Sequence, residues 1–220
     1  MTTIRILSVA MLASVLVSSA LAADEQQAAS AQYAELAAKV RAGDLAIDWQ
    51  ALRVDAVIGF VGNPSEEFQD VKAGYAALSE GKFEDALKLA RAVEGQNIAD
   101  ADAHYVAWRS LVGLGRDDDA ATERKLLAAL MNSIMKSGDG KSADTAWFAA
   151  TIREEYLVMQ MMLNVQFQSQ HSQKIGDHFY DVVSAKDQSG KEMVLWFNTD
   201  TDFRRMQAVT DRFSKKSEDK

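Results

Sequence analysis

The sequence predicts an α+β fold, mostly α-helical hairpins followed by a small three-stranded antiparallel meander and a C-terminal helix. Three observations lead to this prediction. The 220-residue chain is rich in alanine and contains one proline, a composition that favours helix over sheet. A six-residue turn segment occurs twice between residues 67 and 134. Beyond Asn164 the apolar residues change from helical spacing to the alternation typical of strands.

The repeated segment reads GKFEDA at 81–86 and GRDDDA at 115–120, an offset of 34 positions. A glycine can take the left-handed conformation that ends a helix, so we expect Gly81 and Gly115 to close the first helix of each pair. Ala86 and Ala120 are small, helix-forming residues at the point where the paired helices cross. The two segments therefore predict two similar helical hairpins.

With Gly74, Phe83 and Ala86 in register, this part of the chain resembles the tetratricopeptide family, whose 34-residue repeats are pairs of antiparallel helices. The resemblance implies an interaction module. The alternative is a coincidental pair of amphipathic hairpins with similar turns. The second unit departs from the family pattern at three positions. Trp108 stands where the pattern has a small residue, Asp117 where it has an aromatic residue, and Arg124 where it has an aromatic or apolar residue.

In such repeats the first helix of each unit lines a concave groove. By position, its lining would be Phe68, Val71, Tyr75, Leu78, Asp102, Tyr105 and Arg109. Tyrosine and arginine are enriched in binding hot spots, so we take Tyr75, Tyr105 and Arg109 as the candidate binding residues. The expected partner is an unidentified protein or peptide. In the alternative, flanking segments fill the groove and these residues belong to the core.

The first 22 residues have the pattern of a signal peptide. Arg5 supplies a positive start, residues 6–17 an apolar core, and Ala20-Leu21-Ala22 a small-x-small cleavage site. We therefore expect a mature chain that begins at Ala23, is periplasmic or secreted, and has no membrane insertion after cleavage. A retained signal anchor is the alternative. A net charge of −8 argues against nucleic acid as a partner, and the lack of cysteine excludes disulfides.

We divide the mature chain into a helical region (23–163), a β-meander with the C-terminal helix packed on it (164–213) and a flexible tail (214–220). In the helical region, Gly43 is expected to end the first helix, and Asn63 before Pro64 has the pattern of an N-terminal cap.

Two further helical segments are expected in the helical region. Residues 48–55 should form a short packed turn of helix, and a long helix should run from Ala143 to about Leu163. Its apolar face would include Trp147 and Phe148. Glu154 and Glu155 are adjacent and diverge by about 100° on a helix, so we expect both to be solvated rather than to form an acid/base pair.

The meander is expected to have strands near 165–171, 179–185 and 193–197, with turns at 174–177 and 186–190. A small sheet needs its apolar face covered. We expect the final helix, 202–213, to supply that cover through Phe203, Met206 and Val209.

A second resemblance covers nearly the whole mature chain. It rests on motifs in a fixed order: Asp48–Arg53, the Gly81 hairpin, Ser137–Ser142, Glu154–Tyr156, His178–Val182 and Leu195–Asn198. In this order they resemble an exported bacterial family catalogued as a domain of unknown function, number four-nine-one-nine. The resemblance implies export and a helical repeat with a β appendage, and it assigns no catalytic residues.

No group of residues in the sequence predicts an active site, so we expect a binding protein with no catalytic residues, no cofactor and no bound metal. The rival is a small enzyme with its site between the helices and the meander. A third option is a metal-handling protein, in which His171 and His178 bind a metal across a strand turn. The thioethers of Met159, Met161 and Met162 are its other possible ligands, since they suit copper(I). We expect His104 to be an ordinary buried or edge residue of a repeat helix.

Overall fold

The computed structural model describes residues 4–59 and 62–218, with side chains for 23–59, 62–63 and 65–210. The N-terminal helices are α1 (Ile4–Arg41), α2 (Trp49–Ile58), α3 (Pro64–Ser79), α4 (Phe83–Gln96), α5 (Ala101–Gly113) and α6 (Asp117–Met135). The remaining elements are η1 (Ala143–Thr145), β1 (Trp147–Phe148), α7 (Ile152–Leu157), η2 (Val158–Leu163), β2 (Gln166–Ile175), β3 (His178–Lys186), β4 (Glu192–Asn198) and α8 (Asp200–Glu218). The α+β prediction is confirmed.

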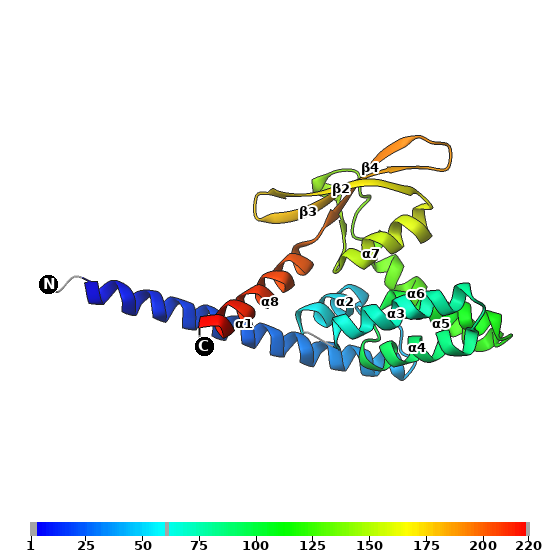
Figure 1. The fold of residues 1–220 in the computed structure, drawn as a ribbon, viewed down its shortest axis with the longest axis horizontal. Helices are drawn as coiled ribbons and strands as arrows, with labels where there is room; N and C mark the ends of the chain where they lie inside the picture. Colours follow the sequence, from blue (N-terminus) through cyan, green and yellow to red (C-terminus); the bar gives the residue numbers. More distant parts are fainter. Residues whose placement is uncertain (1–3, 60–61, 219–220) are drawn as a thin grey trace.

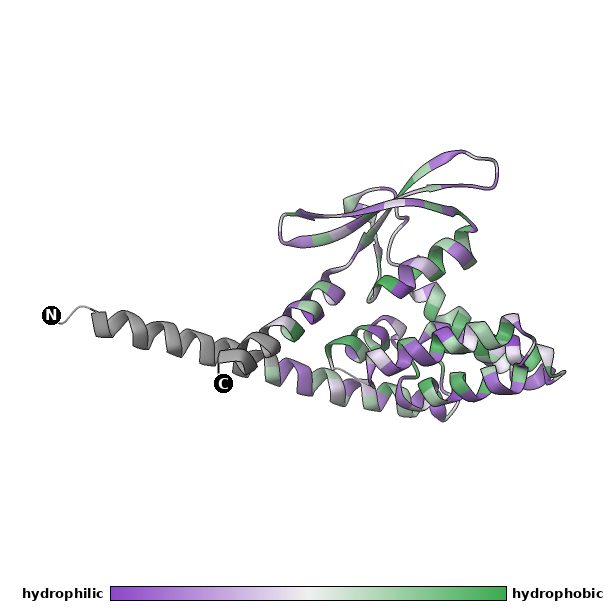
Figure 2. Ribbon diagram, viewed as in Figure 1, coloured by the Kyte–Doolittle hydropathy of each residue, from purple (hydrophilic) through white to green (hydrophobic). Residues whose placement is uncertain are grey.

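The helices and the sheet form two regions that meet at α7 and α8 (Figure 1). Helices α1 to α6 make a helical body, and the sheet lies to one side of it with α7 between them. Helix α8 leaves the sheet and returns toward α1, where Arg204 Nη1 lies 3.7 Å from Glu25 Oε1. Hydrophobic and hydrophilic residues alternate along the helices of the body, as expected of amphipathic helices (Figure 2).

The two predicted hairpins are α3–α4 and α5–α6, and their turns have the same geometry. Gly81 and Gly115 have φ angles of 72° and 69°. In each turn the glycine amide donates to the carbonyl three residues earlier at 3.1 Å, and the next amide donates to the carbonyl five residues earlier at 2.9 Å. Ala86 and Ala120 are 0% and 4% exposed. The prediction of two similar hairpins is confirmed.

The predicted helix end at Gly43 and the predicted cap at Asn63 are also confirmed. α1 ends at Arg41, just before Gly43, and the Asn63 side chain accepts a hydrogen bond from a first-turn amide of α3. Asp48 caps α2 in the same way. The predicted signal peptide covers residues 1–3 and the side chains of 4–22, which lie outside the described part of the structure. Within residues 4–59 and 62–218, no helix combines the length and the apolar character needed to cross a membrane.

The prediction of one helix over 143–163 is wrong. Trp147 and Phe148 form β1, a short strand parallel to β4, and Trp147 is buried with its ring centroid 5.7 Å from that of Phe197. The helix begins only after Thr151, whose side chain caps it, and it changes to π-helical geometry from 158 to 163. Pairing with a strand about 50 positions later in the chain therefore overrides the helical spacing of these apolar residues.

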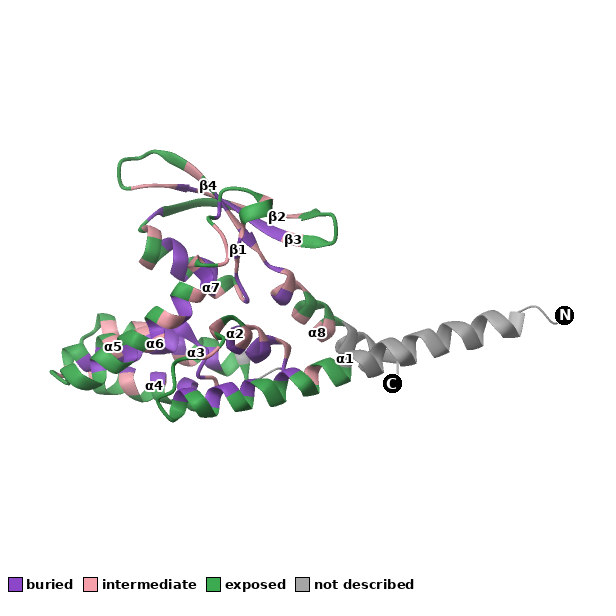
Figure 3. Ribbon diagram, turned by 180° about the vertical axis from the view of Figure 1, so that it is seen from behind, coloured by how far each residue is buried: buried purple, intermediate pink, exposed green. Residues whose placement is uncertain are grey.

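The sheet has the order β1-β4-β3-β2, with β2, β3 and β4 antiparallel. The predicted three-stranded meander is thus present, and β1 adds a fourth strand. Val183, Ala185, Leu195 and Phe197 join the main core, while the tips of the β hairpins are exposed (Figure 3).

Helix α8 covers the sheet only in part. Phe203 stacks on Phe179 at 3.5 Å between ring centroids, as the predicted cover requires, but Met206 is 57% exposed. The predicted end of this helix at 213 is also too early. α8 continues to Glu218, so residues 214–218 of the predicted tail are helical, and residues 219–220 lie outside the described part.

Candidate functional site

The predicted binding residues Tyr75, Tyr105 and Arg109 lie close together on the first helices of the two hairpins. The ring centroids of Tyr75 and Tyr105 are 5.7 Å apart, and those of Tyr105 and Trp108 are 5.9 Å apart. The Arg109 guanidinium lies 5.6 Å from the Trp108 ring, within the range of a cation–π contact. The structure thus forms a continuous aromatic row that ends at Trp108.

Tyr75 is already engaged within the protein. Its hydroxyl donates a 2.7 Å hydrogen bond to Asp102, and Arg153 of α7 donates to the other oxygen of that carboxylate at 2.8 Å. Burial and the Asp102 charge raise the pKa of the Tyr75 hydroxyl. Tyr75 therefore connects the hairpins to α7. The row continues through Tyr105 and Trp108, which are half-buried and pack against the main core, to the exposed Arg109.

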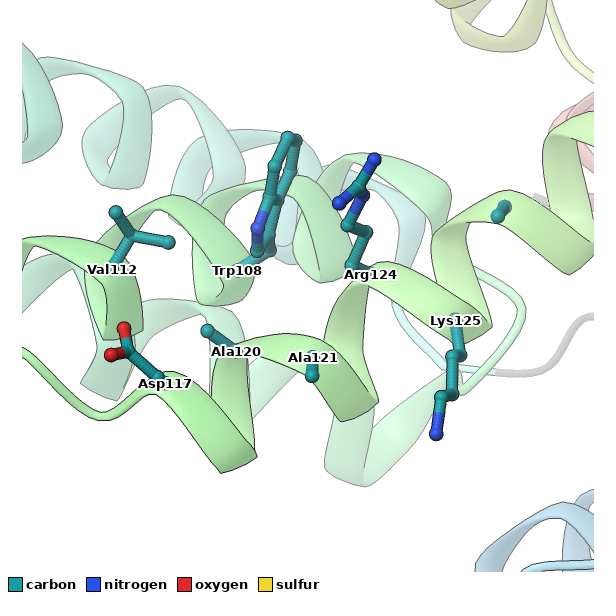
Figure 4. A pocket seen from close by; sticks show the side chains of 8 residues that line it. Trp108, Val112, Asp117, Ala120, Ala121, Arg124 and Lys125 are labelled. Carbon is teal, nitrogen blue, oxygen red and sulfur yellow. The ribbon is translucent and has the colours of Figure 1, made fainter.

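A groove of about 430 Å³ begins beside Trp108, and we call it the end groove. Its lining comes from α5 and α6: Trp108, Val112, Asp117, Ala120, Ala121, Arg124, Lys125 and Ala128. Trp108 and Arg124 project to the same side from these neighbouring helices, with Ala120 near the floor (Figure 4). The Arg124 guanidinium lies 5.9 Å from the Trp108 ring, so the indole is flanked by two arginines.

The end groove of the second hairpin corresponds in position to the surface of the first hairpin that contacts α5. Subtracting 34 from its eight lining positions gives Gly74, Leu78, Phe83, Ala86, Leu87, Ala90, Arg91 and Glu94. Several of these residues pack against α5. A Cβ on Gly74 would lie 3.0 Å from Val106, and Ala86 and Ala90 share a core cluster with Val106 and Ala107. The first hairpin thus holds a helix where the second has an open groove.

The end groove differs from its counterpart in charge and polarity. Ala90 of the first hairpin is replaced by Arg124 and Phe83 by Asp117, while Val112 is 48% exposed. Together with Arg109 and Lys125, Arg124 makes one end of the groove basic in a chain of net charge −8. A helix that filled this groove would need small apolar residues in its middle and acidic residues facing the basic end.

A second cavity, of about 260 Å³, lies between the helical body, α7 and α8. Its charged side chains are mostly paired. Arg53 contacts Glu154 at 2.5 Å, and Arg153 contacts Asp100 and Asp102 at 2.8 and 2.7 Å. These ion pairs join α2 and the start of α5 to α7. They stabilise the junction between the two regions and leave none of the five groups free to act as an acid or base.

Glu67 also lines this cavity and forms no ion pair among the described residues. Its carboxyl is 4% exposed, and Oε1 has no hydrogen-bond partner among the described residues. Burial and the nearby Asp100 raise its pKa. Among the described residues, no nucleophile or second acid pairs with it at hydrogen-bond distance.

The prediction that Glu154 and Glu155 are solvated is wrong, since they are 7% and 0% exposed. Glu154 pairs with Arg53, whereas Glu155 faces the sheet, where Gln170 donates hydrogen bonds to both Glu155 and Asp181. Burial and the Asp181 charge raise the pKa of Glu155 to about 9. Their partners come from elements distant in sequence, which no local pattern indicates.

The structure separates His171 and His178, the possible metal ligands of the third option. His171 pairs with Val182 and His178 with Ile175, so the two lie four rungs apart on the hairpin, or about 13 Å along the strand. His178 instead contacts Asp200 at 2.6 Å.

The methionines of that option differ in their surroundings. Met159 is buried in the main core, whereas Met162 is 42% exposed. Sequence reasoning missed Trp108 and Arg124 as site residues, although the 34-residue offset places both on the surface where a following helix would pack.

The fold and the end groove define an α+β protein with two stacked helical hairpins, an open end and a small sheet. The chain belongs to the family described as Domain of unknown function (DUF4919), whose model matches residues 60–207. No curated protein and no solved structure matches it significantly.

Proposed function

We propose that this protein is a binding module whose end groove accepts an acidic amphipathic helix of a partner protein. The observation that carries the proposal is the equivalence of the two hairpins. On the first hairpin, α5 fills the position that is open on the second hairpin. Helix-in-groove recognition of this kind uses an apolar face in a preformed groove. The aromatic row and its flanking arginines provide residue types that are common in hot spots.

The 34-residue offset and the matching turns support a tetratricopeptide-like character for these hairpins. The pattern of residues 1–22 supports export to the periplasm or the medium. In that case the intact mass of protein from the producing cell should correspond to a chain beginning at Ala23. A chain that keeps residues 1–22 would contradict export with cleavage.

A designed helical peptide tests the groove. The probe carries the Ala103, Val106 and Ala107 face of α5, with glutamates placed opposite Arg124 and Lys125. We expect binding that weakens as salt rises. Trp108→Ala should weaken it by about 2 kcal/mol, or roughly thirtyfold in Kd, since a central tryptophan is a typical hot spot. Isothermal titration calorimetry measures both effects.

A charge-matched pair of variants provides the control. Arg124→Glu plus Lys125→Glu and Lys72→Glu plus Lys88→Glu change the net charge equally, but the second pair lies on exposed positions of the first hairpin. We expect the first pair to weaken peptide binding at least tenfold and the second to leave it nearly unchanged. Equal effects of the two pairs would reject specific recognition at the groove.

A further inference from the structure

Glu94, His104 and Glu123 meet inside the helical body, where α4 contacts α5 and α6. The three residues are 7%, 1% and 3% exposed. One ligand atom from each, a carboxylate oxygen or an imidazole nitrogen, lies within 4.8 Å of the other two. His104 Nδ1 is 2.7 Å from Glu123 Oε2 and 3.3 Å from Glu94 Oε1. Two carboxylates and an imidazole thus converge on one point.

Surrounding groups hold the other atom of each side chain. His104 Nε2 donates to the Ile98 carbonyl at 2.9 Å, which orients the ring with Nδ1 toward the glutamates. Arg91 donates to Glu94 Oε2 at 2.5 Å and to Glu123 Oε1 at 2.6 Å, the oxygens that face away from His104. Metal-binding histidines and carboxylates are typically held in this way by a backbone carbonyl and outer hydrogen bonds.

One carboxylate oxygen of the cluster lacks a hydrogen bond. Glu94 Oε1 is buried, points toward His104 and has no hydrogen bond among the described residues. A buried carboxylate oxygen without a donor is costly, and native structures usually satisfy such atoms with a protein group, a water or an ion. The cluster therefore presents an unsatisfied oxygen next to two other potential ligands.

We propose that Glu94, His104 and Glu123 bind one first-row divalent metal ion, with zinc as the best match. Imidazole and carboxylate ligands suit zinc, whereas calcium and magnesium favour all-oxygen sites. Arg91 would remain as an outer partner of both carboxylates. The proposal does not depend on the end groove.

The two distances from His104 to the carboxylates are close to those of a zinc site. Ligands about 2.1 Å from a tetrahedral zinc ion lie about 3.4 Å apart. The distance from His104 Nδ1 to Glu94 Oε1, at 3.3 Å, already has this length. The distance to Glu123 Oε2, at 2.7 Å, would have to increase by about 0.7 Å for the same separation. The metal would take the place of the hydrogen that Nδ1 shares with Glu123, because ligands bind metal in their deprotonated form.

The location assigns the metal a structural role. Glu94 belongs to the first hairpin, whereas His104 and Glu123 belong to the two helices of the second. A bound ion would therefore fix the stacking of one hairpin on the other. Metal binding to the folded state alone also stabilises it by mass action.

The test titrates chelator-treated full-length protein with zinc chloride at pH 8 and follows heat and the ¹⁵N resonances of the imidazoles. The chain has three histidines, so each can be assigned. We expect one equivalent of zinc, a large shift of the His104 Nδ1 resonance, and no shift at His171 or His178. Glu94→Gln and Glu123→Gln should each weaken binding at least tenfold, while His171→Ala plus His178→Ala should leave it unchanged.

Three results would overturn the proposal. They are the absence of one-equivalent binding by the wild type, a shift confined to His171 or His178, and unchanged affinity in a folded Glu94→Gln variant. The imidazole resonances come from the wild type, so they decide the question even if a substitution prevents folding.

Discussion

Replacing Arg53 with methionine should lower the free energy of unfolding by about 3–5 kcal/mol, since this is the usual cost of removing one partner of a buried ion pair. Arg53 is 1% exposed and donates to Ser133 Oγ at 2.8 Å in addition to its contact with Glu154. Burial already raises the pKa of the Glu154 carboxyl, and Arg53 opposes that rise. Without Arg53, the folded state would contain an unpaired buried carboxylate or a carboxyl that must take up a proton.

Urea denaturation followed by circular dichroism measures this effect. Arg116→Met is the matched control, because Arg116 forms an exposed ion pair with Asp119 that should contribute less than about 1 kcal/mol. The double variant Arg53→Met plus Glu154→Gln should recover part of the loss, since no unpaired charge remains. If Arg53→Met and Arg116→Met lowered the free energy of unfolding equally, the proposed role of the buried ion pair would be contradicted.

The second large effect concerns the pH dependence that Glu155 gives to stability. Its carboxyl faces Asp181 on β3 and Asp202 on α8 and follows Glu154 on α7. Burial and these charges raise its pKa to about 9, from the ordinary glutamate value of 4.5. Between these pH values the folded protein keeps a proton that the unfolded chain releases. The contribution of Glu155 is therefore fully present below about pH 4.5 and falls as pH rises toward 9, by up to about 1.4 kcal/mol per pH unit.

Glu155→Gln should remove this dependence, because glutamine keeps the size and stays neutral. We expect similar unfolding free energies for variant and wild type at pH 5, and a more stable variant at pH 9. Urea midpoints at pH 5, 7 and 9 measure the difference, with the exposed Glu192→Gln as control. A constant difference between variant and wild type across this range would show that Glu155 titrates as an ordinary carboxyl.

Local signals in the sequence were sufficient to predict the hairpins. Gly81 and Gly115 end helices because the residue after a helix often needs a left-handed backbone, and Asn63 caps α3 through its own side chain. These effects involve residues within one turn of each other, so a single sequence contains the information.

The segment 143–163 and the buried glutamates could not be predicted in the same way. Trp147 becomes a strand residue because β4 offers a pairing edge, and Glu154 is buried because Arg53 lies about 100 positions earlier in the chain. The spacing of apolar residues is the same whether Trp147 faces a helix or a sheet. Only the tertiary arrangement distinguishes these cases.

The candidate site was predicted in part. Tyr75, Tyr105 and Arg109 lie together as expected, although whether they bind a partner stays a prediction. The departure at Trp108 was interpreted as an irregularity of the repeat. Trp108 lies 34 residues after Gly74 and is therefore its equivalent in the second hairpin. In the first hairpin this position must be small, because α5 packs closely against it. The Trp108 side chain is half-buried, packs against the main core and lines the end groove.

Photo-crosslinking from the groove in the producing cell tests the binding account most directly. A benzophenone amino acid replaces Ala121 in the end groove or, as a control, Lys72 on exposed α3. The account predicts a single adduct from position 121, formed with an acidic amphipathic helical segment, reduced by Trp108→Ala and absent from position 72. Equal adducts from both positions, no adduct from position 121, or capture of a segment without helical acidic character would contradict it.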